Sequence, residues 1–157
     1  MQSELMTALK RPFHPAKISW RIGARTKDKK KGIALAYIDA RDVMQRLDEV
    51  CGLDWQNDYT TATESGLLVC RIGIKVDNDW IWRANGAGDT QVEAEKGKAS
   101  DAFKRAAVLF GIGRYLYSID KYWIDLENGY MPRDFKAPAL PAWATPEGFD
   151  ALMEKRK

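Results

Sequence analysis

Apolar residues recur at three- and four-residue steps across residues 91–118, which predicts an amphipathic helix. Its predicted apolar stripe consists of Val92, Ala99, Phe103, Ala106, Ala107 and Phe110. Gly111 and Gly113 predict the C-terminal end of this helix. The polar residues fall largely off the stripe, and they include the adjacent cations Lys104 and Arg105. Such a cationic face can bind phosphate, but a core helix with a solvated charged side explains this segment equally well.

Residues 39–86 predict a helix followed by three strands. Asp39 is a natural N-cap for the helix and Gly52 a natural stop. The predicted apolar stripe of this helix consists of Val43, Met44, Leu47, Val50 and Cys51. The predicted strands cover residues 55–63, 67–76 and 80–86, with turns at 64–66 and 77–79. A meander followed by the long helix predicts an α+β fold in which the helix packs across the sheet.

A strongly basic loop separates two further stretches of alternating apolar residues. Residues 18–22 and 33–37 both alternate, so they predict a hairpin with Arg21 on the opposite face from Trp20. The intervening loop, residues 24–32, is too polar to pack in a core. Its three consecutive lysines either only increase solubility or gather a nucleic-acid backbone. We favour the second interpretation because a strand arginine lies beside them.

The two ends of the chain are predicted to contain short helices. One covers part of residues 1–15 and ends before Pro12. Residues 119–130 are extended and aromatic, which favours another strand. Four of the six prolines follow Met131 and indicate a linker. A Thr-Pro pair at 145–146 then predicts the capped start of a terminal helix.

The first 41 residues carry most of the positive charge, although the net charge of the whole chain is only +3. They hold ten Lys or Arg against three acidic residues, a net charge of +7, whereas the remainder has a net charge of −4. Such asymmetry indicates a polyanion-binding end. Cys51 and Cys70 are expected to be reduced and buried. Because the sequence has no apolar run that suits a bilayer span or a signal peptide, we expect an intracellular, cytoplasmic protein.

The sequence contains no common catalytic motif. Gly97-Lys98 lacks the other residues of a phosphate loop, and His14, the single histidine, has no partners for a zinc site. A magnesium nuclease is the leading enzyme alternative, but a charged helix face explains the same carboxylates. Those carboxylates are Asp89, Glu93, Glu95 and Asp101. We therefore expect no enzymatic activity, cofactor or metal. We interpret Trp55, Trp80 and Trp82 as core or sheet-face residues.

Three segments, in this order, resemble the Rad52-type single-strand annealing proteins, in particular the short phage-borne recombinases. The first combines residues 18–21 (ISWR) with residues 36–52 (AYIDARDVMQRLDEVCG). The second is DWQNDY at residues 54–59. The third and most specific lies within residues 86–117 and contains S-D-x-x-K-R-A followed by F-G. Together they extend the resemblance over residues 17–120.

The resemblance implies a β-β-β-α core that assembles into a ring, with single-stranded DNA in a basic groove around its outside. Matched by motif, Lys104 and Arg105 correspond to helix cations of that groove, and Arg21 and Tyr37 to a strand arginine and an aromatic tied to DNA binding. One departure is Val108, where the best-studied members have an arginine. We hypothesise that the lysine-rich loop supplies the missing charge. Its cations are Arg25, Lys27, Lys29, Lys30 and Lys31.

We therefore predict a single-strand annealing domain, which binds DNA and oligomerises, over residues 1–130. A Pro-rich linker and a short C-terminal helix follow over residues 131–157, and no long C-terminal region for binding a strand-exchange recombinase is expected. The predicted function is ATP-independent binding and annealing of complementary single strands in homologous recombination and repair. The expected partners are single-stranded DNA and other copies of the chain, with no membrane; if the protein is phage-borne, its compartment is the bacterial host cytoplasm.

Three other interpretations stay open at this point. One is a protein that coats single-stranded DNA without annealing it, and another is the magnesium nuclease. The third is a scaffold whose terminal helix recruits a host single-strand binding protein, which is compatible with annealing.

Overall fold

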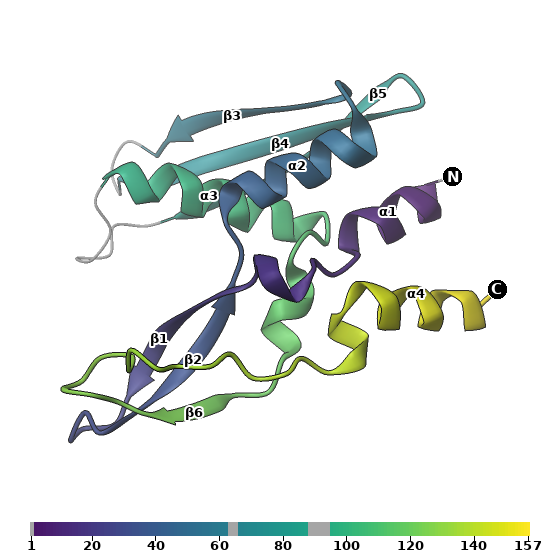
Figure 1. Ribbon diagram of the computed structural model, residues 1–157. Helices are drawn as coiled ribbons and strands as arrows, with labels where there is room; N and C mark the ends of the chain where they lie inside the picture. Colours follow the sequence, from purple (N-terminus) through teal and green to yellow (C-terminus); the bar gives the residue numbers. More distant parts are fainter. Residues whose placement is uncertain (1, 63–65, 88–94) are drawn as a thin grey trace. The chain divides into compact units, whose positions relative to one another are not determined.

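The chain forms two compact units, each built from two separate parts of the sequence. Unit 1 comprises Met1–Arg11 and Ala40–Arg114, and unit 2 comprises Pro12–Asp39 and Tyr115–Lys157. The computed structural model describes residues 2–62, 66–87 and 95–157. Each unit has its own three-stranded antiparallel sheet together with helices (Figure 1), so the predicted α+β fold class is confirmed.

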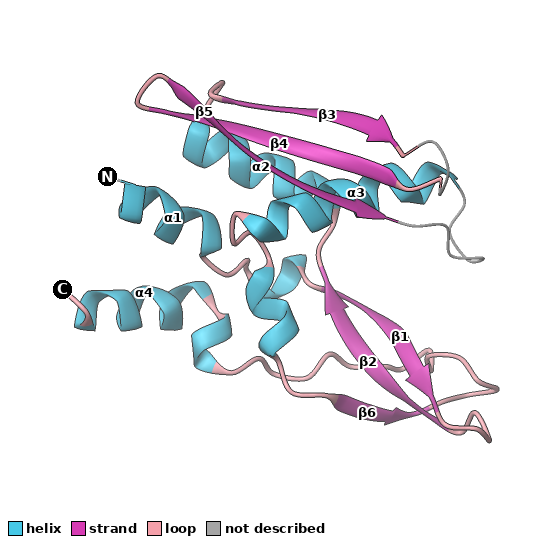
Figure 2. Cartoon of the chain, turned by 180° about the vertical axis from the view of Figure 1, so that it is seen from behind, coloured by secondary structure: helices cyan, strands magenta, loops and turns pink. Residues whose placement is uncertain are grey.

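Unit 1 contains the predicted three-stranded meander, with the strands in sequence order. The strands are β3 (Trp55–Thr61), β4 (Leu68–Val76) and β5 (Asp79–Ala87). Asp77 and Asn78 join β4 to β5 with φ angles of 52° and 70°, the left-handed pair that a tight hairpin turn requires. Helix α3 (Glu95–Leu109) packs against β4 and β5, as the sequence predicted (Figure 2).

The interface between α3 and the sheet is the main core of unit 1. Alternate residues of β4 are buried against the helix because side chains in a strand point to opposite faces in turn. These residues are Cys70, Ile72 and Ile74. The helix contributes Ala102, Phe103, Ala106 and Ala107, and Phe110 follows directly after it; all five residues are buried. Three small alanines on this face let the helix backbone lie close to the sheet.

Gly111 and Gly113 end α3, as predicted, because both adopt left-handed backbone angles, with φ of +94° and +74°. The amide of Gly111 donates to the carbonyl of Val108, and the amide of Ile112 donates to that of Ala107. This pair of hydrogen bonds is the Schellman arrangement, in which the chain reverses direction and satisfies carbonyls at the end of the helix.

Helices α1 (Gln2–Lys10) and α2 (Ala40–Cys51) lie where the sequence predicted them, but the buried face of α2 differs. Val43 and Leu47 are fully buried, whereas Met44 is 40% exposed and Arg46 is only 7% exposed. The Nη1 atom of Arg46 donates to the carbonyl oxygens of Ala8, Leu9 and Arg11 at 3.4, 3.0 and 2.5 Å. Placing Met44 in the apolar stripe was therefore wrong, since the arginine occupies the α1-facing position and binds the unpaired carbonyls at the end of α1.

Unit 2 contains the predicted hairpin and the additional strand. The sheet has the order β1 (Ser19–Arg25), β2 (Lys31–Tyr37) and β6 (Tyr122–Asp125), all antiparallel. The pairing of β1 with β2 is regular up to Ile22 and shifts before Arg25. Ile33 and Ala34 of β2, the central strand, are buried.

The C-terminal part of unit 2 follows its predicted order. No helix or strand occurs in residues 131–141, and Phe135 packs near Trp20 of β1 with ring centroids 6.3 Å apart. Helix α4 (Pro146–Lys155) starts with Pro146 in its first turn, and its N-cap Thr145 accepts a hydrogen bond from the Gly148 amide at 3.2 Å. The short 3-10 helices are Pro15–Lys17, Arg114–Ser118 and Ala142–Ala144.

Some predicted features lie outside the described residues. They include most of the turn at 64–66, the start of the long helix with Val92, and the nuclease candidates Asp89 and Glu93. Within the ranges that the structure describes, no helix is long and apolar enough to cross a membrane.

Candidate nucleic-acid interface

The first group of predicted site residues lies on the hairpin of unit 2. Ser19 pairs with Tyr37 and Arg21 pairs with Leu35 across the two strands, so the side chains of Arg21 and Tyr37 share one face of the sheet. The guanidinium carbon of Arg21 lies 5.7 Å from the centroid of the Tyr37 ring, and this arginine is exposed. The cation–π contact holds a positive charge beside an aromatic surface. Such a pair can contact both a phosphate and a nucleobase.

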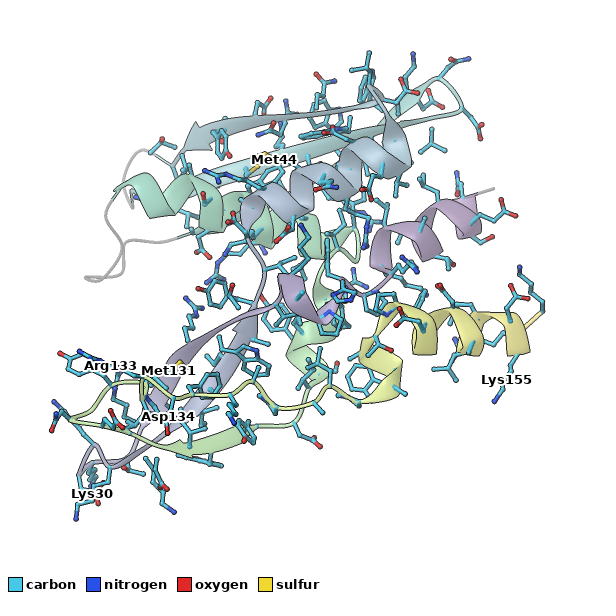
Figure 3. The ribbon with its side chains drawn as sticks, viewed as in Figure 1. Lys30, Met44, Met131, Arg133, Asp134 and Lys155 are labelled. Carbon is cyan, nitrogen blue, oxygen red and sulfur yellow. The ribbon has the colours of Figure 1, made fainter. Side chains whose placement is uncertain are left out.

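The loop cations surround a hydrogen-bonded turn at the end of the same hairpin. The Thr26 hydroxyl donates to Asp28 Oδ1 at 2.6 Å, and the Lys30 amide donates to the same oxygen at 3.0 Å. The hydrogen bond from the Thr26 hydroxyl is the larger cause, and that from the Lys30 amide the smaller, of a lowered pKa of Asp28. Both hydrogen bonds favour the ionised carboxylate. Lys29 adopts a left-handed φ of 59° within the turn. Lys30 extends from the end of the hairpin (Figure 3).

The remaining loop cations are also exposed. Arg25 Nε donates to the carbonyl of Gly129 at 2.9 Å, which fixes that side chain within unit 2. Lys31 lies opposite Asp125 in the pairing of β2 with β6. The exposed cations of this region are Arg25, Lys27, Lys29, Lys30 and Lys31. They concentrate positive charge at the loop end of the hairpin, whereas Tyr37 pairs with Ser19 at its other end.

The second group lies on α3 in unit 1. Lys104 is half-buried and Arg105 is exposed, on the side of the helix away from its buried alanines. Arg105 Nε donates to Asp101 Oδ2 at 2.9 Å, one turn earlier. The Arg105 side chain remains 52% exposed in this ion pair. An exposed pair of this kind contributes little energy, so the arginine can still contact a phosphate.

Asp101 is the nuclease candidate whose side chain the structure describes; that of Glu95 is not described. Its carboxylate takes part in the ion pair with Arg105. Among the described residues, no group of three or more His, Cys, Asp or Glu side chains is placed to hold a metal ion.

Sequence reasoning missed two arginines at the C-terminal end of α3. The side chains of Arg83, from β5, and Arg114 both donate to the carbonyl oxygen of Leu109. Arg83 also lies over the ring of Phe110, with its guanidinium carbon 4.9 Å from the centroid. No spacing in the sequence brings these arginines together, because they meet only after β5 and α3 have packed.

The face of the unit 1 sheet opposite α3 carries aromatic and charged side chains. Trp80 and Trp82 lie on this face, as predicted, with ring centroids 6.1 Å apart. Arg71 stacks over Trp82 at 4.2 Å and forms an ion pair with Asp58. The hydrogen bond from Arg71 lowers the pKa of the Asp58 carboxyl. Trp55, by contrast, lies near the core residue Phe103, at a centroid distance of 6.1 Å.

The predicted site residues thus form two clusters, one in each unit. Unit 2 brings Arg21 and Tyr37 together and carries the loop cations further along the same hairpin, and unit 1 places Lys104 beside Arg105. The basic groove that the resemblance implies, with residues of both groups along it, stays a prediction.

An α+β fold that exposes clustered cations on a hairpin and on a helix is typical of proteins that bind nucleic acids. The chain belongs to the Rad52/22 family of double-strand break repair proteins, whose pattern matches residues 1–135. The resemblance found in the sequence is thereby confirmed.

Two relatives are each named single-stranded DNA-binding protein DdrA. The protein from Deinococcus deserti is 35% identical over 145 residues, which cover 92% of this chain and 72% of the relative. The protein from Deinococcus radiodurans is 34% identical over 146 residues, which cover 92% of this chain and 69% of the relative. No solved structure is significantly similar to the chain.

Proposed function

We propose that this protein binds single-stranded DNA and anneals complementary strands without ATP, in homologous recombination and repair. The observation that carries the proposal is membership of the Rad52/22 family over residues 1–135, together with two relatives that are named single-stranded DNA-binding proteins. The exposed cations on the hairpin and on α3 supply the chemistry that such binding requires.

The mechanism follows from electrostatics. Two complementary strands repel each other because each is a polyanion, and each also folds on itself. Cations such as Arg21, Lys104 and Arg105 neutralise phosphates and keep a bound strand extended. Bases that remain exposed then sample a second strand, and duplex formation supplies the free energy. Binding is therefore indifferent to sequence and sensitive to salt.

Three further features belong to this proposal. The protein assembles into a ring of identical copies and acts in the cytoplasm. The annealing domain ends near residue 130, and the rest of the chain is a linker and a terminal helix. The loop cations extend the DNA path beyond Arg21 and Tyr37.

The test combines a double substitution with two assays. Lys104→Ala with Arg105→Ala should lower the affinity for a fluorescent oligothymidylate and leave the oligomeric state unchanged. If both side chains contact phosphate, the log–log salt slope should fall by about 1.4, because each contact on single strands contributes about 0.7. A matched control is Lys155→Ala with Arg156→Ala, since this adjacent pair is exposed at the end of α4. A double variant that binds and anneals like the wild type would refute the assignment.

Pairing of complementary oligonucleotides, followed by fluorescence, separates annealing from coating. The protein should speed pairing, whereas a protein that only coats DNA would slow it. Loss of the labelled strand that a chelator abolishes would instead indicate the magnesium nuclease.

A further inference from the structure

Two guanidinium groups meet at the C-terminal end of α3. Arg83 Nη1 and Arg114 Nη2 donate to the same acceptor, the carbonyl oxygen of Leu109, the latter at 2.9 Å. Arg114 Nε also donates to the carbonyl of Val108 at 3.0 Å. All of these residues belong to unit 1, so the pair lies on the same rigid helix end as the predicted cations of α3.

The charge at this helix end exceeds what capping requires. The C-terminus of a helix carries roughly half a negative charge, which one cation already balances. Two guanidinium groups therefore leave a surplus of about one and a half positive charges. Like charges repel, so an anion that binds both guanidinium groups would relieve the repulsion between them.

The geometry leaves hydrogen-bond donors for such an anion. A guanidinium group has five N–H bonds, and the contacts given above use one of them in Arg83 and two in Arg114. The other N–H groups of both side chains have no hydrogen-bond partner among the residues that the structure describes. Both arginines are exposed, and the guanidinium group of Arg83 lies over the Phe110 ring, which restricts its position. The planar donor fork of arginine matches phosphate oxygens.

We propose that Arg83 and Arg114 together bind a phosphate of the single-stranded DNA. Leu109 lies four residues after Arg105, about 6 Å further along the helix axis. The two arginines would therefore continue the path of Lys104 and Arg105 by one turn. This inference rests on the proposed function. It differs from the hypothesis that the loop cations, which belong to unit 2, supply the charge that is missing at Val108.

Substitution by glutamine separates phosphate binding from simple capping. In the variant Arg83→Gln with Arg114→Gln, the amide groups can still donate to the helix carbonyls, but both charges are lost. The salt slope for oligothymidylate should fall by about 0.7, as expected for the loss of one phosphate contact on a single strand. When the salt concentration rises from about 50 to 200 mM, the affinity of both proteins falls, and the factor by which it falls should be about 2.6 times smaller for the variant than for the wild type.

A matched control is Arg71→Gln. Arg71 is likewise exposed and stacked on an aromatic ring, Trp82, at 4.2 Å, but it lies on the sheet face opposite α3. This variant should keep the salt slope of the wild type. A wild-type slope in the Arg83/Arg114 double variant would overturn the inference, and the proposed function would stand if the Lys104/Arg105 variant still lowered the slope. Failure of the wild type to bind oligothymidylate would overturn both.

A second measurement uses the unaltered protein, in case the double variant does not fold. An arginine-selective dicarbonyl reagent is applied with and without oligothymidylate, and modification is mapped by mass spectrometry. Bound DNA should protect Arg83 and Arg114 and leave Arg71 reactive. Equal modification of Arg83 and Arg114 in both conditions would overturn the inference.

Discussion

Replacing Arg46 with methionine should strongly destabilise unit 1. The methionine retains much of the apolar stem but removes the guanidinium group that ties α2 to the end of α1. Leu9, one of the three residues whose carbonyls it binds, is itself fully buried. Water can therefore not fully replace the lost donor at that position.

The size of the effect follows from the three contacts. The contact with Ala8, at 3.4 Å, is too long to contribute much, whereas those with Leu9 and Arg11, at 3.0 and 2.5 Å, are full hydrogen bonds. Hydrogen bonds to a charged group contribute about 1.5–3 kcal/mol each, and a buried acceptor without a donor costs about 1–3 kcal/mol. After allowance for partial hydration of the Arg11 carbonyl, we expect a loss of about 3 kcal/mol in the free energy of unfolding.

Urea unfolding followed by circular dichroism measures this loss as a lower midpoint at an unchanged slope. Gln45→Met is the matched control, because Gln45 is an exposed neighbour on the same helix and receives the same new side chain. It should change stability by less than about 0.5 kcal/mol, as is usual for surface positions. If Arg46→Met behaved like this control, the arginine would not be holding α1 in place, and the reasoning would be refuted.

Two further predictions concern local structure in unit 2. Thr145→Ala removes the N-cap of α4 and should cost about 1 kcal/mol of helix stability, visible as faster amide exchange at Gly148; exchange at the wild-type rate would contradict the cap. Hydrogen bonds in the turn lower the pKa of Asp28, so they stabilise the turn above the ordinary pKa of the carboxyl and lose this effect as pH falls through the lowered value. Amide exchange at Lys30 should therefore accelerate beyond its intrinsic pH dependence in that acidic range, and Asp28→Ala should remove the extra change.

Hydrophobic periodicity predicted most elements because each buries one regular face. The alternation at 18–22 and 33–37 matches the hairpin, and the three- and four-residue steps match α2 and α3. The alternation placed Arg21 on the opposite face from Trp20, because a period of two decides which residues of one strand share a side. That Arg21 shares its face with Tyr37 depends on the register of the hairpin, in which Arg21 pairs with Leu35 and Ser19 with Tyr37.

The same rule could not find the residues that act through tertiary contacts. An arginine in a helical pattern is normally assigned to the solvent side, so Arg46 was overlooked in favour of Met44. Its burial depends on the carbonyls of α1, a segment far away in the sequence. Arg83 and Arg114 likewise have a shared acceptor only when β5 lies beside the end of α3. Nor does periodicity say that β6 pairs with β2.

The chain passes between the two units three times, after Arg11, Asp39 and Arg114. The segment Pro12–Asp39, which contains the hairpin, is therefore an insertion between two parts of unit 1. Unit 1 fixes the two ends of this insertion, and the residues between them belong to unit 2. The entropy of closing such an insertion grows only logarithmically, by about 0.6 kcal/mol for each doubling of its length. The lysine-rich tip can therefore be lengthened, or its charge changed, with little effect on the free energy of unfolding of the helix-covered sheet in unit 1.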